Sequence, residues 1–466
     1  MLALAGCSSL IPPYQRPEAP VPPTYPVGTT PAAGPGSEAA ADVDWQRFFA
    51  DPRLRQLIGL ALANNRDLRV AVLNIEQARA LYQVRRADQL PTIGAGATVS
   101  RLPVGGGVAT SYAVGFAVTS YELDLFGRVH DLGEAALAQY FATAENRKAV
   151  QISLVAAVAN AYLNLLADDE LLRVTRQALA TREESTRLTK LRFDNGASSE
   201  LDFRQAESLL EGARVALAQS LRQRALDENA LRLLVGQALP ADLPAPLPLD
   251  RQQIPGDLPA GLPSDLLIRR PDVRASEQQL LAANANIGAA RAAFFPRISL
   301  TANLGSASSD LAGLFKSGSF AFTGAAQLLQ PLFDAGRNRA NLDVAQVNRD
   351  IAVAQYERSI QAAFREVADA LAGRATLGEQ LRAQAAQTNA LAITFRLADL
   401  RYRAGAASYL DTLDAQRQLF LAQQALVQTQ ALQLQNLVTL YRVLGGGWNE
   451  GAELAAGTTP AIAPPQ

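Results

Sequence analysis

Two aspartates and an arginine at helical spacing are the clearest candidates for charge chemistry. Asp411 and Asp414 lie three residues apart in the stretch YLDTLDAQR, and Arg417 follows after three more. In a helix this spacing places all three on one face, where Asp414 and Arg417 can form a local ion pair. An exposed pair of this kind contributes about 0.5 kcal/mol or less. By spacing alone, these residues predict a solvated helical face.

The single cysteine, Cys7, is the one side chain with a predicted covalent modification. It closes the tetrapeptide LAGC, whose small residues fit cleavage by a lipoprotein signal peptidase that leaves the cysteine lipidated. We expect a diacylglycerol and an N-acyl chain on Cys7 and no other cofactor. Ser8 follows it, where lipoproteins retained in the inner membrane usually carry Asp, so the pattern favours the outer membrane. Residues 1–6 are too few for a complete export signal, and we interpret them as its remnant.

Catalysis and nucleic-acid binding find little support in the sequence. One cysteine and one histidine cannot form a disulfide or a Cys/His metal cluster. His130 stands beside Asp131 near an expected helix start, where a surface histidine is a more ordinary interpretation than a catalytic one. The chain contains neither G-x-x-x-x-G-K-S/T nor G-x-S-x-G. A net charge of −1 provides no attraction for nucleic acid. We therefore expect neither an enzyme nor a metal site.

One turn sequence occurs twice and marks a tandem duplication. LRFDNGASSELD (Leu191 to Asp202) and LRYRAGAASYLD (Leu400 to Asp411) are identical at seven of twelve positions and stand 209 residues apart. Further pairs keep this register: Gly236 with Gly445, Arg128 with Arg337 and, at an offset of 205, Asp67 with Asp272. A register held through several anchors predicts two copies of one unit, about 64–236 and 270–445.

Each unit is predicted to open with a helix and continue with two strands. The opening helix covers about 53–88 in the first copy and about 264–294 in the second. Period-2 alternation with one apolar face and one small or polar face then indicates β-strands. The apolar positions of the two clearest strands are Tyr112, Val114, Phe116 and Val118, and Ile298, Leu300, Ala302 and Leu304. Their length of about ten residues suits a transmembrane barrel, although an ordinary half-buried hairpin shows the same pattern.

Long helices without proline follow the strands, Arg128 to Phe193 and Arg337 to Tyr402. Each would be about 100 Å long at 1.5 Å per residue. Two adjacent apolar stripes on each helix predict a neighbour on both sides, as in a closed ring of helices. A glycine ends each long helix, and the chain returns as a shorter helix on which the opening helix can stack end to end. No stretch reaches 18 uninterrupted apolar residues, so we expect no transmembrane helix.

Four strands per chain predict an oligomer. A closed barrel needs about eight strands or more, and unpaired strand edges in lipid cost several kcal/mol per backbone group. Two, three or four copies would supply eight, twelve or sixteen strands, and this arithmetic does not choose between them.

Motifs in order along nearly the whole chain resemble those of the TolC family of outer-membrane efflux ducts, specifically its lipoprotein branch. They are PPYQRP (Pro12 to Pro17), DPRLRQLI (Asp51 to Ile58), YELDLFGR (Tyr121 to Arg128), GLPSDLLIRRPDV (Gly261 to Val273), FFPRISL (Phe294 to Leu300), PLFDAGR (Pro331 to Arg337) and YLDTLDAQR (Tyr409 to Arg417). The resemblance implies a mostly α protein with a transmembrane β-barrel. Three copies would form a twelve-stranded barrel continuous with a long periplasmic α-helical barrel.

The function implied by the resemblance is that of a passive exit duct in the bacterial outer membrane. It would conduct drugs and other small molecules out of a tripartite efflux pump. The implied partners are an inner-membrane transporter of the resistance–nodulation–division type, a periplasmic membrane-fusion adaptor and outer-membrane lipid, with no nucleic acid.

The resemblance also implies roles for the ends of the helical hairpins. The tips that would dock the adaptor are Asn195, Gly196, Ala197 and Ser198, and Ala404, Gly405, Ala406, Ala407 and Ser408. The periplasmic gate would consist of Leu410 as an apolar collar together with Asp411, Asp414 and Arg417. Threefold symmetry would turn each inward-facing residue into a ring of three.

Six segments are expected along the chain. Residues 1–6 are the signal remnant, and 7–52 form a lipid-anchored, proline-rich tether. The first repeat, 53–236, has strands at about 91–101 and 111–122 and a helical hairpin at 128–236. Residues 237–263 form an equatorial segment between the repeats. The second repeat, 264–445, has strands at about 296–305 and 319–330 and a hairpin at 337–445, and 446–466 form an equatorial tail.

Two alternative functions remain open. The exit duct of a type I protein-secretion system has the same fold and differs in its partners. A lipid-anchored structural coiled-coil protein, which belongs to a different class, would lack barrel strands and conduct no ions.

Overall fold

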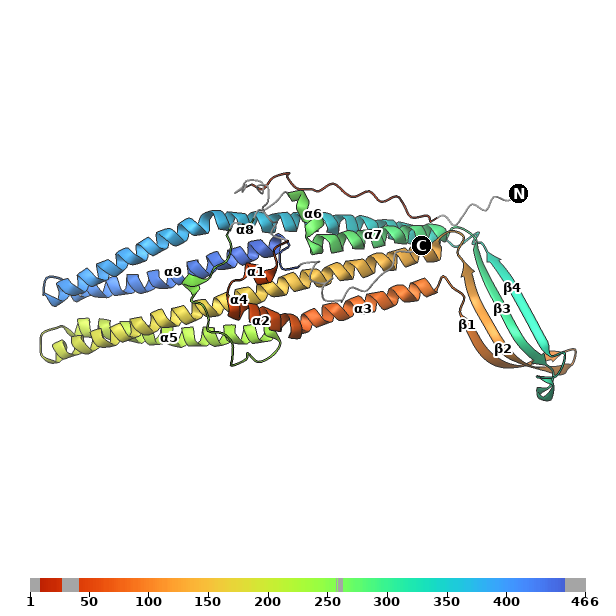
Figure 1. Ribbon diagram of the computed structural model, residues 1–466, viewed down its shortest axis with the longest axis horizontal. Helices are drawn as coiled ribbons and strands as arrows, with labels where there is room; N and C mark the ends of the chain where they lie inside the picture. The colour runs from red at the N-terminus through yellow and green to blue at the C-terminus, as the bar shows by residue number, and fades with distance from the viewer. Residues whose placement is uncertain (1–8, 27–41, 257, 259–262, 449–466) are drawn as a thin grey trace. The chain divides into compact units, whose positions relative to one another are not determined.

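The two halves of the chain fold into matching elements (Figure 1). The computed structural model describes residues 9–26, 42–256, 258 and 263–448. The long helices α4 (Arg128–Asp194) and α8 (Arg337–Arg403) each contain 67 residues and start 209 residues apart. Their return helices are α5 (Glu200–Val235) and α9 (Tyr409–Val443). The duplicated unit predicted from the sequence is confirmed.

The opening helix of each repeat is divided, where the sequence predicted one continuous helix. In the first repeat α2 (Pro52–Asn64) and α3 (Arg66–Ala87) are separated by Asn65, whose ψ of 132° is extended. In the second repeat a short α6 (Leu266–Arg269) and α7 (Pro271–Ala292) are separated by Arg270, with ψ of 118°. Pro271 excludes helical backbone at the residue before it. Asn65 instead caps α3, because its Oδ1 accepts from the Leu68 amide at 3.0 Å.

Contacts divide the described residues into two units, and each unit takes equivalent parts from both repeats. Unit 1 lies within Met1–Ala19, Val72–Asn146 and Arg274–Ser359. Unit 2 lies within Pro20–Ala71, Arg147–Val273 and Ile360–Gln466. Unit 1 therefore contains the strands, and unit 2 contains the return helices.

Unit 1 is built on one antiparallel sheet in the order β1-β2-β3-β4 (Figure 1). The strands are β1 (Ile93–Val104), β2 (Gly107–Leu123), β3 (Arg297–Ser308) and β4 (Phe320–Leu329). The register aligns the predicted apolar faces: Phe116 pairs with Leu304, which pairs with Phe322. The pairing of β2 with β3 joins the two repeats in one sheet.

A bulge in β2 turns one carboxylate to the polar face of the sheet. The pairing with β3 shifts by one residue between Val118 and Tyr121, and Ser120 has a φ of 58°. Because the side-chain period of a strand is two, the extra residue keeps Tyr121 on the apolar face and turns Glu122 to the other. There Glu122 accepts two hydrogen bonds of 2.7 Å from Arg128 and pairs with Arg297 at 2.8 Å.

Buried side chains of α4 form much of the core of unit 2. Both predicted stripes of α4 are largely buried, and Val158, Ala159 and Tyr162 are at most 1% exposed. Thr186 of α4 donates to the carbonyl of Ala206 on α5. Helix α4 also has, among the described residues, the one helical stretch apolar and long enough to cross a membrane, and most of it is buried as in a bundle core.

Part of the predicted tether is docked rather than free. Residues 9–26 form neither helix nor strand, as the prolines predict. Within unit 1, the carbonyl of Pro12 accepts from Asn284 at 2.8 Å, and Arg16 binds Glu277 at 2.7 Å. Within unit 2, helix α1 (Trp45–Phe48) adds a turn inside the segment predicted as tether.

Candidate functional site: the tips and roots of the helical hairpins

The two hairpin tips, the turns 195–199 and 404–408, share one backbone geometry. Gly196 and Gly405 have φ values of 68° and 72°, a left-handed conformation that a side chain would strain. The amides of Gly196 and Ala197 donate to Phe193 and Arg192 at 2.9 and 2.8 Å, and the second tip repeats both bonds. This pattern closes the C-terminus of each long helix.

Serine caps start both return helices. Ser199 accepts from the amide of Asp202 at 3.1 Å, and Asp202 accepts in return from the Ser199 amide at 3.3 Å. Ser408 accepts from the amide of Asp411 at 3.4 Å. Both tips are therefore defined turns whose exposed residues are held in fixed positions.

Aromatic side chains pack behind each tip. Phe193 stacks on Phe203 with ring centroids 5.9 Å apart, and Tyr402 lies 5.0 Å from Tyr409. The guanidinium of Arg192 lies 4.7 Å from the centre of the Tyr402 ring, so a cation of the first hairpin contacts the second.

The four predicted gate residues lie on the open side of α9. Leu410 is 58% exposed, and Asp411 and Arg417 are also exposed. Asp414 is half-buried and pairs with Arg417 one turn along the helix. The opposite side of the same turns, with Thr412, Leu413 and Gln416, is buried. Within one chain the arrangement is thus the local ion pair that the spacing predicted, on a face that another chain could cover.

The opposite end of each hairpin, where the return helix ends, is here called its root. At the first root, Nδ2 of Asn65 donates to the carbonyl of Leu234 in the last turn of α5 at 2.9 Å. Asn65 thus caps the start of α3 and the end of α5 together, and the opening helix continues from the return helix as predicted. Leu231 and Val235 of α5 are buried there.

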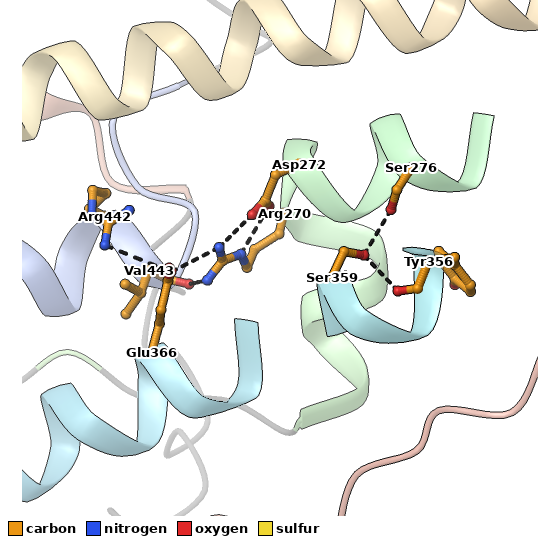
Figure 2. A network of polar contacts seen from close by, with 8 residues as sticks. All are labelled: Arg270, Asp272, Ser276, Tyr356, Ser359, Glu366, Arg442 and Val443. Atoms are coloured by element: carbon orange, nitrogen blue, oxygen red, sulfur yellow. Dashed lines mark hydrogen bonds and ion pairs between the residues drawn. The ribbon is translucent and has the colours of Figure 1, made fainter. Parts of the chain in front are cut away.

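At the second root an arginine takes the place of the asparagine (Figure 2). Nη1 of Arg270 donates to the carbonyl of Val443 in the last turn of α9 at 3.2 Å. The same guanidinium binds Asp272 at 3.0 and 2.5 Å and Glu366 of α8 at 3.0 Å. Arg442 lies 3.7 Å from the same Glu366 oxygen. Figure 2 also shows Ser276 with Ser359, which belong to unit 1 and bond at 2.8 Å.

Ion pairing determines the charge states of Arg270 and Asp272 at the second root. Burial alone would raise the pKa of Asp272, but the hydrogen bonds and charge of Arg270 outweigh it and hold that pKa below its usual value. Both side chains are therefore charged at neutral pH. The sequence did not predict this cluster, because Glu366 and Val443 lie 96 and 173 residues from Arg270. The one signal in the sequence was that an arginine, Arg270 of RPD, stands where the first repeat has Asn65 of NRD.

Three predicted features lie wholly or mainly outside the described residues. These are the signal remnant at 1–6, the lipidation site Cys7 and most of the tail at 446–466. No group of three or more His, Cys, Asp or Glu side chains placed to hold a metal occurs in the part of the chain that the structure describes.

Comparisons with known proteins define the class. The family model "Outer membrane efflux protein" matches residues 57–237 and 262–446, one segment in each repeat. The chain therefore belongs to the outer membrane efflux protein family, an outer-membrane class of non-enzymatic transport ducts.

Relatives with known sequences align with this chain along nearly its whole length. The probable efflux pump outer membrane protein TtgC of Pseudomonas putida is 49% identical over 458 residues, covering 96% of this chain and 94% of the relative. Outer membrane protein OprJ of Pseudomonas aeruginosa is 45% identical over 462 residues, covering 97% and 95%.

Solved structures show the same fold. The open state of the MtrE outer membrane channel of Neisseria gonorrhoeae is 43% identical, with a TM-score of 0.87 over 95% of this chain and 99% of that one. The CmeC outer membrane channel of Campylobacter jejuni is 26% identical, with a TM-score of 0.85 over 97% of each chain. The predicted family, fold class and efflux function are confirmed.

Proposed function

We propose that this chain is the exit duct of a tripartite efflux pump and that it works as a homotrimer anchored partly by lipid on Cys7. The observation that carries the duct function is the match of both repeats to the efflux family over 57–237 and 262–446. An inner-membrane transporter of the resistance–nodulation–division type would supply the energy, and a periplasmic membrane-fusion adaptor would join it to the duct.

Small apolar or amphipathic compounds are the proposed cargo. Relatives at 49% identity are described as toluene, solvent and antibiotic efflux pump outer membrane proteins. We propose that this duct carries compounds of the same classes, selected by the transporter and not by the duct, because a passive conduit adds no binding energy of its own.

Exposed apolar residues support assembly with further copies of this chain. In α8, Ile393, Leu397 and Leu400 form a stripe whose side chains are 44–55% exposed. Beside it, on the side that faces α9, lies a half-buried stripe formed by Leu391, Phe395, Ala398 and Tyr402. Two adjacent stripes require a neighbour on each side, and one chain provides only one. A second copy that covers the exposed stripe would continue the ring of helices.

The hairpin ends have two proposed roles. The capped tips at 195–199 and 404–408 would dock the adaptor at the periplasmic end of the helical barrel. Leu410, Asp411, Asp414 and Arg417 would narrow the entrance, where rings of acids favour cations as charged rings do in channels. Residues 237–263 and 446–466 would form an equatorial belt, and the six-segment division stays a proposal.

Complementation tests the function. A strain that lacks its own efflux duct should regain resistance to exported antibiotics when it expresses this chain with its transporter and adaptor. Purified protein in a planar bilayer should give stable single-channel currents. Absence of currents would favour the structural coiled-coil alternative, and export of a protein substrate without any change in drug resistance would favour type I secretion.

A further inference from the structure

The two hairpin roots are equivalent in position and different in charge. We propose that Arg270, Glu366 and Arg442 form an ionic clamp that fixes the root of the second hairpin and so resists displacement of the gate face on α9, whereas the first root lacks these charges at the equivalent positions. The clamp itself is a local property of unit 2. The effect of the clamp on opening of the duct rests on the proposed duct function, whereas the clamp itself does not.

Arg270 is placed to connect three helices. Its guanidinium binds Asp272 in the first turn of α7, Glu366 in α8 and the Val443 carbonyl at the end of α9. The side chain is 7% exposed, so these contacts form away from bulk water. Charge-assisted hydrogen bonds are roughly twice as strong as neutral ones.

Removing one member of this group leaves the others poorly paired. Glu366 accepts from Arg270 at 3.0 Å and lies 3.7 Å from Arg442. Two arginines thus share one glutamate, while Asp272 balances the remaining positive charge. Loss of the Glu366 charge would leave the buried Arg270 with one acid and bring two guanidinium groups together without their common partner, which is destabilising.

The repeat provides an internal comparison. At the offsets of 205 and 209, the first-repeat counterparts of Arg270, Glu366 and Arg442 are Asn65, Ala157 and Leu233. The hydrogen bond to the end of the return helix is kept, from Asn65 to Leu234 at 2.9 Å. Leu233, the counterpart of Arg442, is 79% exposed. The two roots thus share the cap, and the second carries the ion network in addition.

A small rotation at the root of a hairpin produces a large displacement at its far end. About 30 residues of α9 separate Arg442 from Asp411, or about 50 Å of helix. A rotation of about 5° at the root would move the gate face by about 4 Å. A stiff second root would therefore resist displacement of the gate residues on α9.

Hydrogen exchange of the full lipidated protein in detergent tests the clamp. Glu366→Gln keeps the size of the side chain and removes its charge. We expect amides at the end of α9 and in the turn after it (residues 440–446) to exchange about tenfold faster or more, equal to about 1.4 kcal/mol. The equivalent amides of α5 (residues 231–237) should not change. Arg442→Gln, whose contact is longer, should give a smaller increase of about threefold at the same amides.

Asp67→Asn is the matched control, because Asp67 is the exposed first-repeat counterpart of Asp272. It should leave exchange at both roots unchanged. Wild-type exchange at residues 440–446 in Glu366→Gln, or an equal increase at both roots, would overturn the clamp. Single-channel conductance is recorded on the same samples. If Glu366→Gln exchanges faster but conducts like the wild type, the clamp exists and has no role in opening. If the wild-type protein itself gives no channel currents, the proposed duct function is wrong.

Discussion

At the scale of single residues, Asp168 is the carboxyl group whose pKa is raised most among the described residues. It lies in α4, 7% exposed, and its Oδ2 has no hydrogen-bond partner among the described residues other than a neighbouring carboxyl. Burial first, and then the hydrogen bond and charge of Asp227, raise the pKa of Asp168 to about 7. Asp169 adds to the rise and Arg224 opposes it. Since two ionised carboxylates cannot hydrogen-bond, the pair holds one proton between α4 and α5.

This pair predicts a loss of stability as the pH rises. The pKa in the folded state exceeds that of an unfolded aspartate, about 3.9, so the folded state binds the extra proton between pH about 4 and about 7. The stabilising contribution is complete below that window and is lost as pH passes through 7. The temperature of unfolding should fall between pH 5 and pH 8 in the wild type. Asp168→Asn, which stays neutral, should reduce that fall. Glu170→Gln should keep it, because Glu170 pairs with Arg173 and does not act on Asp168. An undiminished pH dependence in Asp168→Asn would rule out the shared proton.

At the scale of elements, local sequence patterns predicted the parts that depend on periodicity and caps. The ends of α4 and α8, the glycine turns and the apolar faces of the strands all follow from spacing within a few residues. The break at Asn65 was not predicted, because the apolar pattern continues across position 65. There the Asn65 side chain caps the start of α3 and the end of α5. The bulge at Ser120 was missed because one inserted residue leaves the alternation intact on either side. The cluster at Arg270 joins residues far apart in sequence, which no local pattern encodes.

The close approach of β2 and β3 gives an element-scale prediction. Gly115 pairs with Gly305, and a Cβ on Gly115 would lie 2.3 Å from the carbonyl oxygen of Leu304. That contact is with backbone, so Gly115→Ala must push the strands apart at a cost of about 1–3 kcal/mol. Gly96→Ala is the control, because Gly96 pairs with Gly115 and its Cβ would have open space. Heat-modifiable electrophoresis should show a lower dissociation temperature for Gly115→Ala alone. Equal behaviour of the two variants would contradict the close packing.

At the scale of the whole molecule, the sheet has two edges that one chain does not pair. In the described residues β1 pairs only with β2, and β4 pairs only with β3. Exposed edges are unfavourable in water because they template further pairing, and in lipid they leave backbone groups without hydrogen bonds. The edge of β4 in one copy should therefore pair with the edge of β1 in the next. Three copies would close twelve strands, and native mass spectrometry in detergent should report three chains.

Disulfide crosslinking tests the same closure directly. With Cys7 as the single natural cysteine, new cysteines can be placed without background from other thiols. Thr98→Cys in β1, combined in turn with cysteines at successive positions of β4, should give covalent dimers and trimers at one register. The control is Ala113→Cys with Ala307→Cys, which are partners within one chain and should crosslink without changing the apparent mass. Covalent dimers without trimers, or only monomers at every position of β4, would show that three copies do not close the sheet.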